Sequence, residues 1–212
     1  MLQTKINSRL KRSLAYVLAF TMLQTSYAPI AQAKKDFPSF KTQSFQGSGD
    51  DIVDFETGKR AIVRFSCPAC TSNTALKTDG RESLLVNEIG SYTGEHLINM
   101  NANTLTTSYE ITADSSWTLS ISDLNSVTRV TGKSVSGQGT SVVYVSSTYS
   151  KVLVKNVGMS NFVIYSWPIK QPSFFSPLLV NEIGSYKGTK RIKTPGLVSI
   201  RSQGEWSLNF SK

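Results

Sequence analysis

Histidine and cysteine are scarce in this sequence, with one histidine and two cysteines among 212 residues. A single histidine excludes most histidine-based catalysis and any metal site that needs several histidines. Two cysteines exclude a zinc or iron–sulfur site made of four thiolates from one chain. Charged residues are also few, at 17%, whereas hydrophobic residues make up 39%. This balance is typical of a globular chain.

Long apolar runs are absent too. The apolar stretch at residues 14–23 is too short for a stable membrane span. It follows four basic residues and no acid, and it precedes Ala31-Gln32-Ala33, which has small residues where signal peptidase reads. Residues 1–33 are therefore predicted to be a signal peptide, with an uncleaved anchor as the alternative. We expect an exported protein that is periplasmic, secreted or on the cell surface, without a transmembrane segment in the mature chain.

The rest of the chain contains an internal repeat. The nonapeptide LLVNEIGSY occurs at residues 84–92 and recurs unchanged at residues 178–186. Similar residues flank both copies, such as WTL at 117–119 and WSL at 206–208. A period of about 90 residues suits a small domain and is too long for a solenoid repeat. The sequence therefore predicts a duplicated module.

The repeat also fixes the expected domain boundaries. The two modules are placed at about residues 45–122 and 135–212. Residues 123–134 are predicted to be the linker between them. Residues 34–44 are predicted to be a polar, poorly ordered N-terminal segment.

Both modules have the sequence features of β-strands. Residues 61–65, 151–155 and 161–165 are short and rich in β-branched and aromatic residues. Residues 117–121 and 206–210 alternate apolar with polar side chains, as half-buried strands do. We predict an all-β fold of two tandem small antiparallel β-sandwich modules, Ig-like or jelly-roll-like. One larger sandwich built from both copies is the alternative.

The repeated nonapeptide has two interpretations. As a ligand loop it would present polar or aromatic side chains at four positions of each copy: Asn87, Glu88, Ser91, Tyr92, Asn181, Glu182, Ser185 and Tyr186. As a structural element it would be a buried strand and a tight corner, with the tyrosine packed back on the sheet and the second glycine of the motif, Gly94 or Gly188, at positive φ. The structural interpretation is favoured, because a corner needed in both copies requires no ligand to explain it.

Cys67 and Cys70 have the spacing of a redox-active dithiol. They lie between two predicted strands, and the second module has no cysteine at the matching place. A small disulfide at a hairpin tip is therefore predicted rather than redox catalysis.

No catalytic residues, metal site or cofactor are predicted. His96 has no catalytic partner in the sequence, and the acidic cluster at residues 50–56 is replaced by uncharged residues in the second module. We therefore predict that the protein is not an enzyme. A carboxylate-based hydrolase is the less favoured alternative.

Charge is distributed unevenly along the chain. Residues 34–135 carry 10 basic and 12 acidic side chains, whereas residues 136–212 carry 9 and 2. We expect a basic patch from five side chains of the second module: Lys187, Lys190, Arg191, Lys193 and Arg201. Such a patch attracts polyanions in a salt-dependent way. A solvated surface, or docking of the basic module onto the acidic one, would explain the charges equally well.

Four motifs in order carry a family resemblance: GSGDDIV at 47–53, SN before a strand, the nonapeptide followed by x-Gly, and ADSSWTL at 113–119. In this pattern the chain resembles a group of uncharacterised bacterial exported proteins with repeated small β-sandwich modules. The resemblance covers most of residues 45–212 and implies the module fold, but it says nothing about catalysis.

The expected function follows from the predicted export, the repeat and the charge. We expect a non-enzymatic binding protein of the bacterial envelope that engages a polyanion or glycan through its basic second module. Sequence-specific binding of nucleic acid is not expected. The alternative is a structural or protein-interaction component of an envelope or secreted assembly, with a protein partner.

Overall fold

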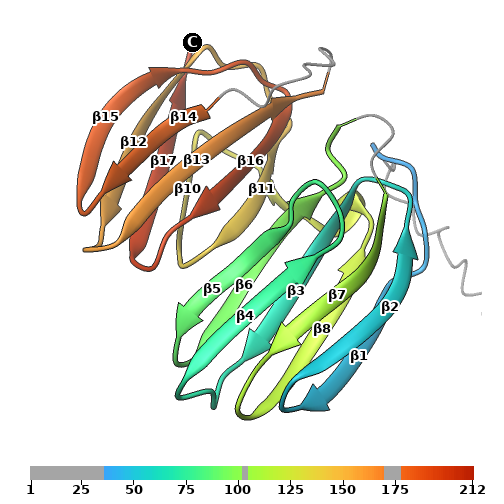
Figure 1. The fold of residues 1–212 in the computed structure, drawn as a ribbon. Coiled ribbons are helices and arrows are strands. Elements are labelled where there is room, and N and C mark those ends of the chain that lie inside the picture. Colours follow the sequence, from blue (N-terminus) through green and yellow to red (C-terminus); the bar gives the residue numbers. More distant parts are fainter. Residues whose placement is uncertain (1–35, 102–104, 170–177) are drawn as a thin grey trace, which may run out of the picture. The chain divides into compact units, whose positions relative to one another are not determined.

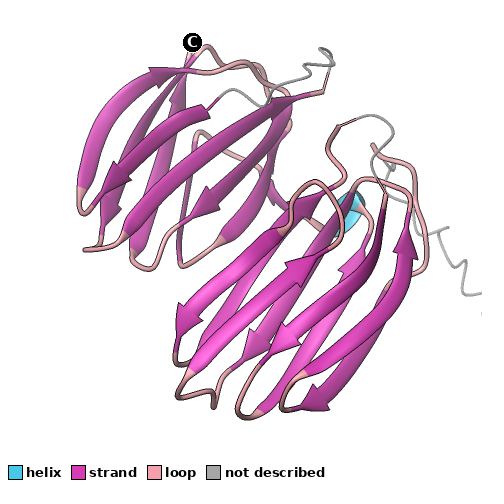
Figure 2. Cartoon of the chain, viewed as in Figure 1, coloured by secondary structure: helices cyan, strands magenta, loops and turns pink. Residues whose placement is uncertain are grey.

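The computed structural model describes residues 36–101, 105–169 and 178–212 (Figure 1). Residues 35–212 form one compact unit. Strands dominate the described part of the chain, with a 3₁₀ turn, η1, at Leu124–Ser126 (Figure 2). None of its helical structure has the length and hydropathy needed to cross a bilayer. The predicted signal peptide, residues 1–33, lies outside the described residues.

The first sandwich is formed by eight strands in the described part of residues 43–122. They are β1 (Gln43–Ser48), β2 (Asp51–Thr57), β3 (Ala61–Cys67), β4 (Asn73–Thr78), β5 (Leu84–Ile89), β6 (Tyr92–Ile98), β7 (Thr106–Thr112) and β8 (Ser116–Ser122). One sheet has the order β1-β8-β3-β6 and the other β2-β7-β4-β5.

The second sandwich repeats this arrangement. Its strands are β10 (Ser134–Gln138), β11 (Ser141–Val145), β12 (Lys151–Val157), β13 (Asn161–Pro168), β14 (Leu178–Ile183), β15 (Tyr186–Arg191), β16 (Gly196–Arg201) and β17 (Glu205–Ser211). One sheet has the order β10-β17-β12-β15. In the other, β14-β13-β16-β11, the short strand β9 (Thr128–Val130) adds to β11 in parallel.

The strand order identifies each sandwich as a jelly roll. Its first, eighth, third and sixth strands form one sheet, named here the 1-8-3-6 sheet, and the others form the 2-7-4-5 sheet. The prediction of two tandem antiparallel sandwiches is confirmed, and the strand order favours the jelly roll over the Ig-like fold. No sheet mixes the eight strands of one sandwich with those of the other, which excludes a single larger sandwich among the described residues.

The two nonapeptides have the same backbone setting. Each runs through a strand, turns at a glycine and enters the next strand, with φ at 90° for Gly90 and 88° for Gly184. The corner is therefore at the glycine, while Asn87 and Glu88 belong to β5. The structural interpretation predicted the strand and the corner, but it placed the positive φ at the second glycine, Gly94 or Gly188, which instead lies within the next strand, β6 or β15.

Each sandwich core contains a tryptophan fixed in the same way. Trp117 Nε1 donates to the carbonyl oxygen of Gly49, and Trp206 Nε1 donates to that of Gly139, both at 2.9 Å. A Cβ at residue 137 would lie 2.5 Å from the Cζ2 atom of Trp206. Glycine is needed there because the indole ring occupies the space of a side chain.

Cys67 and Cys70 lie at disulfide distance, with Sγ atoms 2.01 Å apart, and both are buried. The segment after them is held by Asp114, which accepts hydrogen bonds from Thr71 and Ser72. The bonds from Thr71 hold the pKa of Asp114 at about 2. The predicted disulfide is confirmed by the distance between the two sulfur atoms. The predicted hairpin tip is wrong, because the flanking strands β3 and β4 belong to different sheets.

Residues 36–44 contact the rest of the chain through hydrogen bonds and apolar packing, while their expected poor order stays a prediction. The Phe37 and Phe40 N–H groups donate to Asn125 Oδ1 and Asp123 Oδ2, each at 3.1 Å. The Phe40 ring packs against the first core. Although the segment is polar overall, its phenylalanines bury apolar area, which favours these contacts.

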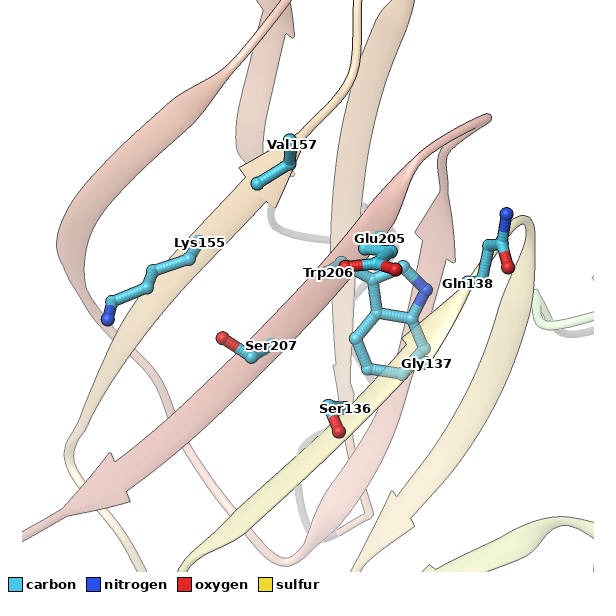
Figure 3. Close-up of a pocket in the computed structure, with 8 residues that line it drawn as sticks. All are labelled: Ser136, Gly137, Gln138, Lys155, Val157, Glu205, Trp206 and Ser207. Atoms are coloured by element: carbon cyan, nitrogen blue, oxygen red, sulfur yellow. The ribbon is translucent and has the colours of Figure 1, made fainter.

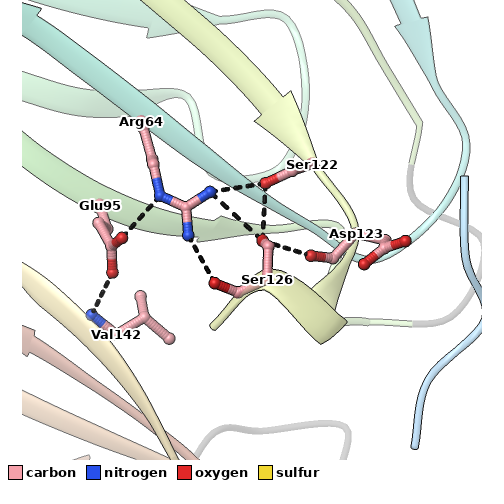
Figure 4. Close-up of polar contacts among 6 residues, drawn as sticks. All are labelled: Arg64, Glu95, Ser122, Asp123, Ser126 and Val142. Carbon is pink, nitrogen blue, oxygen red and sulfur yellow. Dashed lines mark hydrogen bonds and ion pairs between the residues drawn. The ribbon is translucent and has the colours of Figure 1, made fainter. Parts of the chain in front are cut away.

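A third apolar cluster, which we call the joint, connects the two sandwiches. Its buried members come from both of them and from the segment between: Ile62, Leu97, Met100, Leu124, Val127, Val142, Tyr144 and Leu197. Polar contacts border it (Figure 4). Arg64 Nε donates to Glu95 Oε1 at 2.7 Å, and Glu95 Oε2 accepts from the Val142 N–H at 3.3 Å.

Candidate binding face on the second sandwich

Four basic residues lie on the outer surface of the 1-8-3-6 sheet of the second sandwich. Val152 and Val154 point into the core, so the residues that alternate with them on β12, including Lys151 and Lys155, point outward. The antiparallel register places Lys151 directly opposite Arg191, and Lys155 directly opposite Lys187. Residues directly opposite share a face of the sheet. We call Lys151, Lys155, Lys187 and Arg191 the basic face.

Within the described residues no ion pair neutralises the charges of the basic face, although the exposed Glu205 carboxylate lies on the same outer surface near Lys155. All four side chains are exposed, and none of them forms an ion pair within the described part of the chain. Like charges directly opposite in a sheet reduce its stability. The β12–β15 pair therefore carries two destabilising contacts, and an anionic ligand would relieve both.

A shallow depression of about 580 Å³ adjoins the basic face (Figure 3). Its polar side chains come from three neighbouring strands: Ser136, Gln138, Lys155, Glu205 and Ser207. The first sandwich has a depression of about 560 Å³ at the matching place, where Ser66 replaces Lys155. Both sandwiches therefore have the depression, but only in the second sandwich does a basic residue, Lys155, line it.

The five basic residues predicted from sequence are spread over different surfaces. Lys187 and Arg191 lie on the basic face, and Lys193 follows β15 and is exposed. Lys190 points to the other side of β15, where its Nζ lies 5.8 Å from the centre of the Tyr186 ring. Arg201, at the end of β16, is close enough to buried His96 to affect its pKa.

Lys151 and Lys155 were missed by the sequence reasoning. They are exposed and bracket the alternating strand KVLVK. The alternation places both on one face, which was a usable signal. Their proximity to β15 depends on a strand pairing across more than 30 residues, and no local pattern reveals it.

The tyrosines of the nonapeptides are core residues. Tyr92 stacks on Phe65 with ring centres 6.3 Å apart, and its hydroxyl lies 2.7 Å from His96 Nε2. Burial raises the pKa of Tyr92 to about 12. Tyr186 packs against Phe162 in the second core.

The polar residues of the nonapeptides do not form a common site. Glu88 accepts a hydrogen bond from the Gln203 side chain, whereas Asn87, Asn181 and Glu182 are exposed on their strands. Among the described residues, no group of three or more His, Cys, Asp or Glu side chains could hold a metal ion.

No protein-family model matches the chain, and no curated protein matches it. Among solved structures the chain is similar to one described as the crystal structure of the stem and receptor binding domain of the spike protein P1 from bacteriophage PM2. The identity is 10%, the match covers 84% of this chain and 81% of that chain, and the TM-score is 0.20. At that TM-score the similarity adds nothing to the assignment of fold or function.

Proposed function

We propose that the protein is an exported, non-enzymatic binding protein of the bacterial envelope, and that its basic face engages an anionic glycan. The observation that carries the proposal is the pair of like-charged contacts, Lys151 with Arg191 and Lys155 with Lys187. Such contacts cost stability. A surface that keeps them exposed and without an ion pair among the described residues is suited to an anionic partner.

The surroundings of the basic face favour a glycan over other polyanions. The same outer surface presents hydroxyl and amide groups on β10 and β17, including Ser136, Ser207 and Asn209. These groups both donate and accept hydrogen bonds, as sugar hydroxyls require. Aromatic side chains, on which the bases of single-stranded nucleic acids stack, are absent from the described residues that face outward on this sheet.

Glycan binding is tested with heparin as a sulfated-glycan probe, titrated at about 50 mM salt, where screening is weak. The titration uses the chain without residues 1–33, because residues 35–212 form one compact unit. The variant Lys155→Glu/Lys187→Glu should bind at least about tenfold more weakly, a loss of roughly 1.4 kcal/mol.

The matched control is Lys59→Glu/Arg60→Glu, which changes net charge equally at two exposed residues of the first sandwich. It should retain wild-type affinity within about twofold, since affinity is proposed to depend on local contacts. Equal weakening in both variants would mean that heparin responds only to net charge, and the proposed site would be wrong.

Export is tested separately by recovering the protein from the periplasm or medium of a bacterial host and sequencing its N-terminus. Cleavage after Ala33 predicts Lys34 as the first residue. Recovery with Met1 intact in the cytoplasm would contradict the proposed location.

A structural role in an assembly is the second candidate function. The joint favours it, because a buried apolar cluster shows that the outer surface of one jelly roll is able to receive another.

A further inference from the structure

The joint uses different faces of the two sandwiches. The first contributes the outer surface of its 1-8-3-6 sheet, with Ile62 of β3 directly opposite Leu97 of β6. The second contributes the outer surface of its 2-7-4-5 sheet, with Tyr144 of β11 directly opposite Leu197 of β16. The contact is therefore head-to-tail between two copies of one fold, a heterologous interface.

A head-to-tail contact leaves one equivalent face unused on each sandwich. The registers define the equivalence, because Tyr92 pairs with Cys67 where Tyr186 pairs with Asn156. Counting along the strands from these pairs, Lys151 and Arg191 take the places of Ile62 and Leu97. The unused 1-8-3-6 face of the second sandwich is thus the basic face.

The unused face of the first sandwich is acidic at the matching positions. Val53 points into the core, so Ile52 and Asp54 of β2 point outward. Asp54 takes the place of Tyr144, and Glu110, directly opposite Ile52, takes the place of Ser199. On the unused 1-8-3-6 face both joint residues, Ile62 and Leu97, are therefore replaced by cations. On the unused 2-7-4-5 face Tyr144 is replaced by a carboxylate, whereas Val142 is replaced by Ile52 and Leu197 by Ser108.

The Asp54 carboxylate is available for a partner, whereas Glu110 is already paired with Lys77 on the same face. Asp54 is exposed and has no ion pair within the described residues, and Glu110 forms only a half-exposed pair with Lys77 at 3.1 Å. The imbalance extends to the whole modules. Residues 45–122 carry 5 basic and 10 acidic side chains, whereas residues 135–212 carry 9 and 2. The two unused faces are thus complementary in charge as well as in their place on the fold.

We infer that a second copy of the chain docks its acidic 2-7-4-5 face, at Asp54 and Glu110, on the basic face at Lys151 and Arg191. The contact repeats the geometry of the joint with charge replacing apolar packing. Because it is heterologous, it adds copies in an open row rather than closing as a dimer. This inference goes beyond the proposed glycan binding, and an anionic polymer would compete with the second copy for the same cations.

Sedimentation of the chain without residues 1–33 tests the inference. At about 50 mM salt the average mass of the wild type should rise with concentration past that of a dimer, and it should fall to the monomer at about 0.5 M salt. Lys151→Glu/Arg191→Glu and Asp54→Lys/Glu110→Lys should each be monomeric alone, because their facing surfaces repel. An equimolar mixture of the two variants should associate, since each then meets an opposite charge.

The fourfold variant that combines both pairs of substitutions separates local pairing from net charge. It has the wild-type net charge with the two faces exchanged, and it should associate as the wild type does. A wild type that stays monomeric at low salt and about 1 mM protein, whether or not it binds heparin, would overturn the inference. Failure of both the mixture and the fourfold variant to associate would overturn it as well.

Discussion

Lys190 shows how one position carries different chemistry in the two sandwiches. It takes the place of His96, and each side chain lies over the tyrosine of its own nonapeptide. The ring centres of His96 and Tyr92 are 6.1 Å apart, and Lys190 Nζ lies 5.8 Å from the centre of Tyr186. Because it packs on a tyrosine ring, Lys190 is separated from the basic face despite its position between Lys187 and Arg191 in sequence.

The stability of the protein should depend on His96 below neutral pH. Burial, with a smaller contribution from the Arg201 charge, lowers the pKa of His96 from 6.5 to about 3. In the unfolded chain His96 binds a proton near pH 6.5, whereas in the folded chain it stays neutral at that pH. The stability contributed by neutral His96 is therefore complete above pH 6.5 and decreases toward pH 3, by about 1.4 kcal/mol per pH unit.

Urea unfolding at pH 7 and pH 5 measures this effect. In His96→Gln the loss of unfolding free energy between the two pH values should be smaller than in the wild type by roughly 2 kcal/mol. Carboxylates titrate in both proteins and cancel in the comparison. An identical loss in the two proteins would show that folding does not lower the pKa of His96.

Gly137 should tolerate no side chain. In Gly137→Ala the new Cβ meets the Trp206 ring, and repacking should cost about 1–3 kcal/mol of unfolding free energy. Gly132→Ala is the control, because a Cβ there meets no atom within 4 Å. Denaturant midpoints should fall in the first variant and remain unchanged or rise slightly in the second. Equal midpoints would contradict the packing of the indole over this glycine.

At the scale of elements, β12 and β15 combine a stability cost with the proposed binding. Lys187→Glu replaces one like-charged pair with an attractive contact to Lys155. It should raise the unfolding free energy by about 0.2–1 kcal/mol while weakening heparin binding. Opposite changes in the two measurements would support a binding role, whereas a loss of stability would show that the two lysines do not oppose each other.

The strands could be predicted from sequence because their signal, the pattern of apolar and polar residues, lies within each strand. The predicted segments 61–65, 151–155 and 161–165 lie within β3, β12 and β13, because alternation and β-branched residues report burial on one face. Pairing between distant strands leaves no such pattern. The sequence therefore revealed Lys187 and Arg191 but not their neighbours across the sheet, and it grouped Arg201 with them although it lies near His96.

At the scale of the whole molecule, the joint should make the two sandwiches unfold together. Leu97→Lys introduces a charge into this apolar cluster, where Leu97 is 7% exposed. An unpaired buried charge is costly, so the joint should open. Calorimetry should then resolve two transitions in place of one. Leu84→Lys, at a residue that is 46% exposed, should keep the single transition.

A single transition in Leu97→Lys would show that the sandwiches are coupled by something other than the joint. Two transitions in the wild type would show that the joint contributes little cohesion. Either result would weaken the comparison between the occupied and the unused faces, on which the proposed docking of a second copy depends.

The salt dependence of heparin binding counts the cations that contact the polymer. Each contact adds about one unit to the slope of log affinity against log salt concentration. Lys155→Ala/Lys187→Ala should therefore have a slope shallower than the wild type by about two units, whereas Lys59→Ala/Arg60→Ala should keep the wild-type slope. Equal slopes for all three proteins would contradict binding through the basic face.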